Sequence, residues 1–350
     1  MIYPVFKYAY PNAKIRAMKG TLVSAEKFLA LLNAVSYQEF LRILESTGYA
    51  AALRKYTGEL PIPVLTNILY KSLFTDYEKT IHALTGETQK FFILLYQKYE
   101  LINLKTILRG ICSNVEPEQV APLLLPTERY ALFSKERLLT FRRVQEVVTH
   151  LRHTFFEYPL QQALRRYEEE QEFFPLEMAL DLHYYQALWD EIRKLSHDEG
   201  AIIRKLIGMA TDVINVSWIV RFKEQYHFSP EEILNYTIHH GDTLKFRDRR
   251  MLANAPGASD ILAYLQKTRC GKGIAEGAAL STLHVTLTRQ VVAQLRKYFG
   301  GYPFQIGVIL GYLFLKEFEI ADLMTVAEAK KYGFSLEQST EYVIHRTRDD

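Results

Sequence analysis

The chain has 350 residues, of which 48% are hydrophobic and 24% are charged, a composition that excludes a largely disordered protein. Lys and Arg number 43 against 40 Asp and Glu, and the net charge of +3 is too small to favour nucleic acid as a partner. The two cysteines, Cys112 and Cys270, exclude a disulfide framework and a four-thiolate zinc site.

The first predicted helix carries a basic edge. Lys14, Arg16 and Lys19 form this edge, and Ile15 and Met18 lie on the opposite face. A solvated helix face is the ordinary interpretation of such a pattern, and contact with a partner protein is the alternative. The preceding residues, 1–6, lack the basic and apolar segments of a signal peptide.

Helical periodicity continues along the chain. Apolar residues recur three and four positions apart in 28–35, 91–99, 202–207 and 309–314, whereas the strict alternation that predicts a strand is hard to find. The sequence therefore predicts an all-α protein.

The longest uncharged run, 298–315, is slightly shorter than a membrane span, which needs about 20 apolar residues. It is also interrupted by Gly300, Gly301 and Pro303. We therefore expect a buried helix from about Phe304 and a soluble, cytoplasmic protein, which leaves room for a peripheral place on a membrane complex.

One ten-residue segment recurs three times. Motif 1 runs from Glu100 to Arg109, motif 2 from Asp212 to Arg221, and motif 3 from Glu319 to Glu328. The motifs share an acid at the first position, Ile or Val at the eighth, and an amide or acid at the fourth, namely Asn103, Asn215 and Asp322.

A structural role suits these polar positions better than catalysis. General acid–base chemistry needs its groups within hydrogen-bond reach of one substrate, whereas each motif offers one acid of its own. The first-position acids are expected to be either helix N-terminal acids favoured by the helix dipole or contacts between helices. The fourth-position side chains are expected to fix how each motif helix meets its neighbour.

Each motif is followed by a predicted helix start at nearly the same spacing. Pro117 and Pro230 suit the first helical position, while Ser229 and Ser335 begin capping boxes. The lead-ins Tyr226-His-Phe228 and Tyr332-Gly-Phe334 also match.

These spacings predict three similar helical-bundle units, 1–113, 114–227 and 228–350, with pseudo-threefold symmetry. Stacked units of this kind bury their apolar faces against their neighbours. Three of them can close into a ring or funnel that suits an elongated partner.

Signals of catalysis or cofactor binding are weak. The segment 271–273 lacks the spacing of a phosphate-cradling loop, so we expect no binding of ATP. His150 and His153 share a predicted helix face and could be zinc ligands, but surface histidines are the more ordinary explanation. The sequence therefore predicts no catalytic residue, cofactor, metal or small-molecule substrate.

Three segments carry a resemblance to a known family, namely Tyr10–Lys19 with the following Leu22, Leu44–Tyr49 and Tyr99–Arg109. They resemble the C subunit of bacterial and archaeal V-type (A-type) ATPases, which is equivalent to the d subunit of the eukaryotic enzyme. The likeness extends over most of the chain.

The resemblance implies a non-catalytic central-stalk adaptor, built as a funnel of three similar helical domains. It implies that the protein sits peripherally at the cytoplasmic face of the membrane, with the rotor shaft subunits and the membrane proteolipid ring as partners. It further implies that torque passes through this protein between ATP hydrolysis or synthesis and ion movement. The alternatives are a free-standing helical scaffold that binds a partner helix or peptide and an enzyme whose site the sequence does not reveal.

Overall fold

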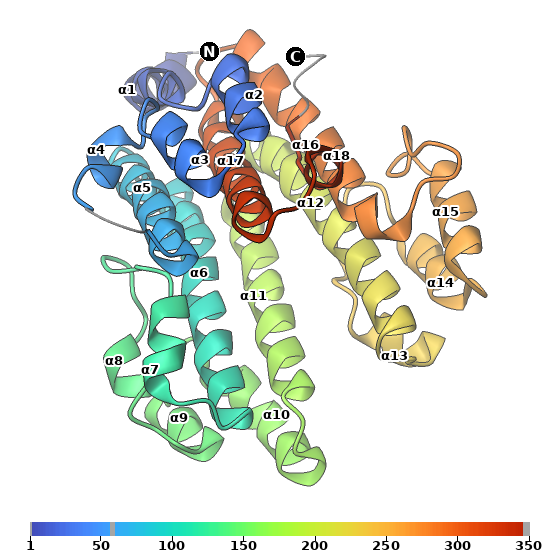
Figure 1. The fold of residues 1–350 in the computed structure, drawn as a ribbon. Coiled ribbons are helices and arrows are strands. Elements are labelled where there is room, and N and C mark those ends of the chain that lie inside the picture. The colour runs from blue at the N-terminus through green and yellow to red at the C-terminus, as the bar shows by residue number, and fades with distance from the viewer. Residues whose placement is uncertain (1, 57–59, 346–350) are drawn as a thin grey trace. The chain divides into compact units, whose positions relative to one another are not determined.

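A computed structural model describes residues 2–56 and 60–345 of the chain (Figure 1). Within these residues every regular element is a helix and none is a strand, so the prediction of an all-α protein is confirmed. The chain divides into two compact units. Unit 1 combines Met1–Thr57 with Leu195–Asp350, and unit 2 is Gly58–Lys194.

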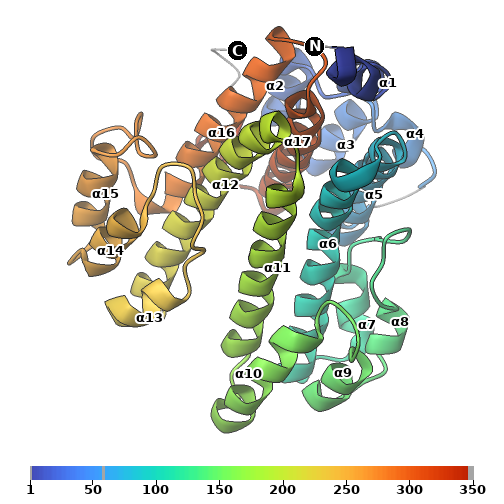
Figure 2. The same ribbon diagram turned by 180° about the vertical axis from the view of Figure 1, so that it is seen from behind.

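Unit 2 is contiguous in sequence and is built on long helices. Helix α6 packs against both α5 and α11, and α10 packs along α11 (Figure 2). The helices of unit 2 are α5 (Ile62–His82), α6 (Gly86–Cys112), α7 (Pro117–Val120), α8 (Lys135–Leu138), α9 (Val144–His150), α10 (Glu157–Glu170) and α11 (Phe174–Lys194), with a 3-10 turn at Ala121–Leu123.

The contact between α6 and its neighbours combines an aromatic core with charged pairs. Phe92, Tyr96 and Tyr99 of α6 are almost completely buried. At the seam with α11, the Lys105 ammonium lies 2.8 Å from both carboxylate oxygens of Asp181. This ion pair joins α6 to α11 where both side chains are mostly shielded from water.

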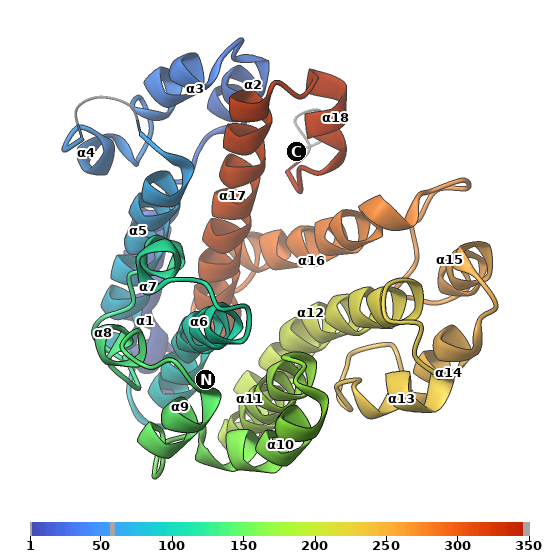
Figure 3. The same cartoon turned by 60° about the horizontal axis from the view of Figure 1, so that its bottom comes forward.

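Unit 1 is assembled from the two ends of the described chain. Helices α12, α16 and α17 contact one another in pairs, and α1 and α3 also contact α17 (Figure 3). Its helices are α1 (Ile2–Lys19), α2 (Ala25–Asn33), α3 (Tyr37–Leu44), α4 (Ala50–Leu53), α12 (His197–Glu224), α13 (Pro230–Asn235), α14 (Phe246–Asn254), α15 (Ala258–Gln266), α16 (Leu283–Gly300), α17 (Ile306–Tyr332) and α18 (Leu336–Glu341), with a 3-10 turn at Leu280–Thr282.

The buried helix that was expected near Phe304 is α17. It begins at Ile306, and every residue from there to Lys316 is buried, as in a helix surrounded by protein. Among residues 2–56 and 60–345, no helix combines the length and the apolar character that crossing a membrane requires.

The predicted helix starts are present. The Ser229 and Ser335 side chains each accept a hydrogen bond from the backbone N–H three residues on, and the Glu232 and Gln338 side chains complete both capping boxes. Pro117 begins α7 and Pro230 begins α13. These helix starts depend on only a few neighbouring residues, which is why the sequence could predict them. The division into 1–113, 114–227 and 228–350 and the funnel stay predictions.

Candidate functional site

The three motifs lie in the interior of the longest helices, with motif 1 on α6, motif 2 on α12 and motif 3 on α17. Their acids are therefore not helix N-terminal residues, and that interpretation of the sequence was wrong. The exposed fractions are 0% for Glu100, 1% for Asp212 and 5% for Glu319. Burial on this scale requires hydrogen-bond partners, because a charged group loses its solvation when it leaves water.

Backbone N–H groups supply these partners in motifs 1 and 2. Glu100 Oε2 accepts the N–H of Leu132 at 3.1 Å, which lies 32 residues downstream. Asp212 Oδ2 accepts the N–H groups of Thr243 at 2.7 Å and Leu244 at 3.2 Å, which lie 31 and 32 residues downstream. Each acid thus holds the segment that leads into a short helix, α8 or α14.

The acid of motif 3 makes the same kind of contact with a distant segment. Glu319 Oε2 accepts the N–H of Val23 at 2.6 Å, and Oε1 accepts the Tyr49 hydroxyl at 2.9 Å. Val23 leads into α2. All three acids therefore fasten the start of a short-helix segment to a long helix.

The fourth-position side chains fasten a second segment. Asn103 accepts the N–H of Leu125 at 2.7 Å and donates to its carbonyl at 3.0 Å. Asn215 makes the same pair of bonds with Ile238, at 2.8 and 2.9 Å. A side-chain amide can do this because it both donates and accepts.

Motif 3 replaces the amide by a carboxylate, which can only accept when ionised. Asp322 accepts the N–H groups of Ile344 at 2.6 Å and His345 at 2.9 Å, and it also lies 2.5 Å from the His345 ring nitrogen Nδ1. Its partner Ile344 is 22 residues downstream, against 22 and 23 for the partners of Asn103 and Asn215. The three side chains therefore anchor corresponding segments.

Burial controls the protonation of the motif acids. Loss of solvation raises the pKa of Glu100, Asp212 and Glu319 above the ordinary carboxyl values, and the hydrogen bonds from backbone and hydroxyl donors oppose that shift. A raised carboxyl pKa is also common at catalytic sites. Here, however, at least one carboxylate oxygen of each acid accepts hydrogen bonds from backbone donors that position the chain.

The last position of the motif differs among the three. Arg109 Nη2 lies 3.0 Å from Glu177 Oε1 and joins α6 to α11. Arg221 Nη2 donates to the Tyr226 hydroxyl at 2.9 Å, and its guanidinium lies 5.4 Å from that ring's centroid. Motif 3 has an exposed Glu328 at this position. The terminal residue is therefore adapted to its local neighbours.

The basic edge lies on α1, with Arg16 and Lys19 exposed. Lys14 Nζ is 5.8 Å from the Tyr10 ring centroid. Lys19 Nζ is 4.4 Å from the Phe299 ring centroid, and Arg16 donates to the Phe299 carbonyl at 3.4 Å. Part of this edge thus packs on the end of α16, and its contact with a partner stays a prediction.

A further repeated feature escaped the sequence analysis. In Leu44–Thr47, Leu151–Thr154 and Leu265–Thr268, the threonine hydroxyl donates to the leucine carbonyl three residues earlier, at 2.6, 2.6 and 2.7 Å. The signal is the pattern Leu-x-x-Thr, which recurs about 20 residues after each segment that a motif acid holds. Two residue types at one spacing are too common to be recognised without the fold.

The histidines considered as zinc ligands do not share a helix face. Helix α9 ends at His150, whereas His153 follows it with a φ of 64°. The His150 ring packs 5.4 Å from the Phe141 ring. In residues 2–56 and 60–345, no three His, Cys, Asp or Glu side chains are grouped as a metal site would require.

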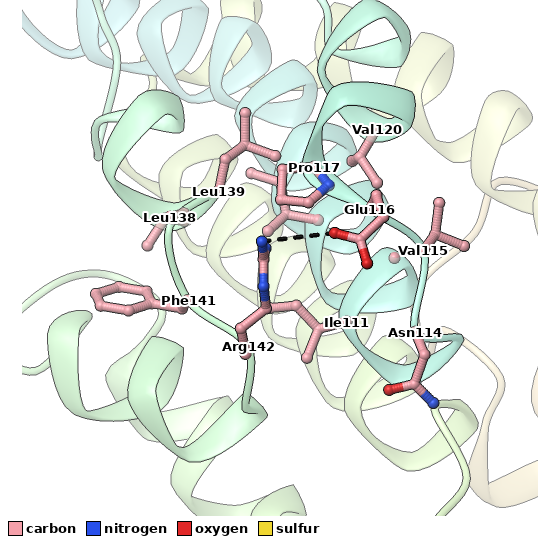
Figure 4. Close-up of a pocket in the computed structure, with 12 residues that line it drawn as sticks. Ile111, Asn114, Val115, Glu116, Pro117, Val120, Leu138, Leu139, Phe141 and Arg142 are labelled. Atoms are coloured by element: carbon pink, nitrogen blue, oxygen red, sulfur yellow. Dashed lines mark ion pairs between the residues drawn. The ribbon is translucent and has the colours of Figure 1, made fainter.

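A small cavity lies beside motif 1. It has a volume of about 120 Å³ and is lined by the end of α6, α7 and residues 138–142. Figure 4 shows apolar side chains such as Val120 and Leu139 around it, with the Arg142 guanidinium reaching toward Glu116. Arg142 Nη2 lies 3.6 Å from Glu116 Oε2, and both side chains are largely exposed. Apolar side chains and the charged pair of Arg142 and Glu116 therefore line this cavity together.

Another cavity, of about 90 Å³, lies beside motif 2 and is lined partly by Asp212, Cys270 and Gln290. Burial raises the pKa of the Cys270 thiol to about 12. The thiolate is the reactive form of cysteine, so this thiol suits a structural position rather than a nucleophilic one.

Comparison with known proteins assigns a family. The family described as ATP synthase (C/AC39) subunit matches residues 11–342. The C subunit of the A-type ATP synthase of Archaeoglobus fulgidus is 28% identical over 339 residues, covering 95% of this chain and 94% of that protein. The C subunits of the A-type ATP synthases of Methanocaldococcus jannaschii and Methanothermobacter thermautotrophicus are 26% and 27% identical, each covering 94% of this chain, and 84% and 86% of their own lengths.

Proposed function

This chain belongs to the ATP synthase (C/AC39) subunit family, and from this premise we propose that it is the non-catalytic central-stalk adaptor of a rotary V/A-type ATPase. In this role it seats the rotor shaft on the membrane proteolipid ring and transmits torque between ATP chemistry and ion transport. It lies peripherally, at the cytoplasmic face of the membrane. The family match over 11–342 is the observation that carries the proposal.

The construction of the long helices supports a mechanical role. Helices α6, α12 and α17 have 27, 28 and 27 residues, which corresponds to about 40 Å each at 1.5 Å per residue. Each is fastened to segments elsewhere in the chain by two buried side chains, an acid and an amide in α6 and α12 and two acids in α17. Torque that separated these helices from their segments would break the hydrogen bonds of the buried groups. Each buried group left without a partner costs about 1–3 kcal/mol.

We further propose that the three motif-bearing regions form pseudo-threefold units around a hollow that receives the shaft. A polar hollow is expected, because a large exposed apolar surface would promote aggregation when the shaft is absent. Polar and charged contacts are screened over about 8–10 Å at ordinary salt, so the affinity for the shaft subunits should fall as the salt concentration rises.

Co-purification with the shaft subunits across a salt series tests this proposal. We expect a complex at low salt that is progressively lost as the salt concentration increases. No complex at any salt would refute the adaptor function, and binding of isolated helical peptides in its place would favour the free-standing scaffold. Binding that strengthens with salt would show that the grip is mainly apolar.

The basic edge of α1 is tested in the same assay. Reversing Lys14, Arg16 and Lys19 to Glu should weaken the complex if this edge contacts a partner. Reversing the exposed Arg165 of α10, which forms an i,i+4 pair with Glu169 on the same helix, serves as the control at a solvated helix face. An equal response of both variants would identify the basic edge as a solvated face.

A further inference from the structure

The outer face of α1 is apolar although it is exposed to solvent. Tyr8, Asn12 and Ile15 lie on the inner face of this helix and are buried. The outer face carries Phe6, which is 81% exposed, and Tyr10, which is 64% exposed. Exposed alanines continue this apolar stripe at helical spacing, namely Ala9, Ala13 and Ala17. A surface helix ordinarily presents polar side chains to water, so the apolar stripe indicates a binding surface.

Basic side chains border the apolar stripe. Lys14 and Arg16 flank it on opposite sides of α1, and Lys19 follows at the end of the helix. The Lys14 ammonium lies near the Tyr10 ring, whereas Arg16 and Lys19 reach Phe299 at the end of α16. The stripe and the basic edge are therefore parts of one surface.

The junction of α16 and α17 extends this surface. Arg296 and Lys297 stand near the end of α16, and Tyr302 in the following loop is 51% exposed. The Asn12 amide holds the loop against α1, because it donates to the Gln305 carbonyl at 3.2 Å. Figure 1 and Figure 2 both show α1 and this junction at the same end of unit 1. That end thus combines exposed aromatic rings with five basic residues.

Acidic residues are scarce in the segments that form this surface. The sequence contains no Asp or Glu in 1–25 or in 277–316. Glu199 of α12 contacts α1, but it is 9% exposed and its carboxylate lies 2.5 Å from the Lys7 ammonium. The adjacent Asp198 is exposed and offers one negative charge against the five basic residues. The surface is therefore positive and suits an anionic partner.

The composition favours a lipid surface over a protein as that partner. Three of the five basic residues are lysines, Lys14, Lys19 and Lys297, and lysine is depleted at protein–protein interfaces. At a membrane surface, by contrast, long basic side chains keep their charges in water while their stems cover apolar groups. Aromatic side chains are enriched at the depth of the lipid headgroups. Helices that lie in the plane of a membrane combine these two features.

We propose that the outer face of α1 binds the surface of a bilayer that contains anionic lipids. The rings of Phe6 and Tyr10 enter the headgroup region, and the basic edge, with Arg296 and Lys297, pairs with the lipid phosphates. The protein thereby gains a direct hold on the membrane without a helix that spans it. That this membrane is the one that holds the proteolipid ring rests on the proposed function, whereas the affinity for lipid does not.

Co-sedimentation of the full chain with lipid vesicles tests the proposal. One set of vesicles is phosphatidylcholine alone, and the other contains equal parts of phosphatidylcholine and phosphatidylglycerol. We expect affinity for the anionic vesicles to be at least about tenfold higher and to fall as salt is added. Lys297→Gln should weaken this binding by about fivefold. Phe6→Ala and Tyr10→Ala should each weaken it several-fold without unfolding the protein, because both side chains are largely exposed.

Matched variants elsewhere in the chain provide the controls. Phe246 of α14 is 59% exposed and Arg165 of α10 is exposed, so Phe246→Ala and Arg165→Gln should leave vesicle binding unchanged. Equal binding to both kinds of vesicle, binding to neither, or equal loss in the Phe6 and Phe246 variants would overturn the proposal. Binding to detergent-solubilised proteolipid ring without binding to vesicles would also overturn it and assign the stripe to a protein partner. Failure of the adaptor function is measured separately, by co-purification with the shaft subunits in the absence of lipid.

Discussion

Replacing the anchoring amides with leucine should destabilise the protein to different and calculable extents. In Asn215→Leu, the new side chain can neither accept the N–H of Ile238 nor donate to its carbonyl. In Asn103→Leu the N–H of Leu125 similarly loses its acceptor, but the Leu125 carbonyl keeps a second donor, the Lys135 ammonium at 2.9 Å. Asn215→Leu thus leaves two buried backbone groups without partners, and Asn103→Leu leaves one. Asn103→Leu also removes the donor 3.0 Å from the Thr127 hydroxyl oxygen, but that hydroxyl keeps its hydrogen bond to the Glu100 carboxylate.

The expected magnitudes follow from that difference. A buried polar group left without its partner costs about 1–3 kcal/mol, so Asn215→Leu should cost about 2–6 kcal/mol and Asn103→Leu about 1–3 kcal/mol. Asn254→Leu is the control, because Asn254 is exposed on α14 and donates within its own helix, to the Arg250 carbonyl. Its effect should stay within about 0.5 kcal/mol.

Urea unfolding of the full chain measures these differences as shifts of the midpoint, and hydrogen exchange locates them. Faster exchange is expected at 237–245 in Asn215→Leu and at 124–127 in Asn103→Leu. The reasoning would be refuted if Asn215→Leu unfolded like wild type, or if Asn103→Leu were the more damaging substitution.

Two further predictions follow from the buried ionisable groups. Burial raises the pKa of Glu100 above its ordinary value of 4.5, so the folded state binds this proton more readily than the unfolded state. The stabilisation that protonated Glu100 gives the folded state is therefore fully present below pH 4.5 and is lost as the pH rises through the folded-state pKa. Glu100→Gln should therefore gain less stability than wild type when the pH is lowered from 7 to 5, as measured by urea midpoints; an identical pH response would contradict this. Because burial raises the pKa of Cys270 to about 12, iodoacetamide at pH 8 should alkylate it at least tenfold more slowly in the native chain than in urea, and equal rates would contradict the assignment.

Local features of the fold were readable from the sequence. A capping box needs only four residues, so Ser229 and Ser335 could be assigned without any knowledge of the rest of the chain. The buried helix α17 could also be predicted. Its first ten residues are uncharged on every face, whereas an amphipathic surface helix has apolar residues on one face only.

The partners of the motif acids were not readable. The sequence left two interpretations open for Glu100 and Asp212, a helix N-terminal acid and a contact between helices, and it named no partner for either residue. Their partners are backbone N–H groups 32 and 31 residues away, which carry no side-chain signature.

The bond between Glu319 and the N–H of Val23 joins residues 296 positions apart and imposes an order on folding during synthesis. Unit 2 is a continuous stretch of chain, whereas unit 1 needs both 1–57 and 195–350. At about 5–20 residues per second, α2 and α3 leave the ribosome roughly 15–60 s before the acid that fastens them. During that interval Phe28, Leu31 and Leu32, all buried in the finished protein, can contact α3 but lack the cover that α18 supplies. The first helices to be made are thus the last to be fixed in place, because their contacts with α17 and α18 form only after those helices emerge.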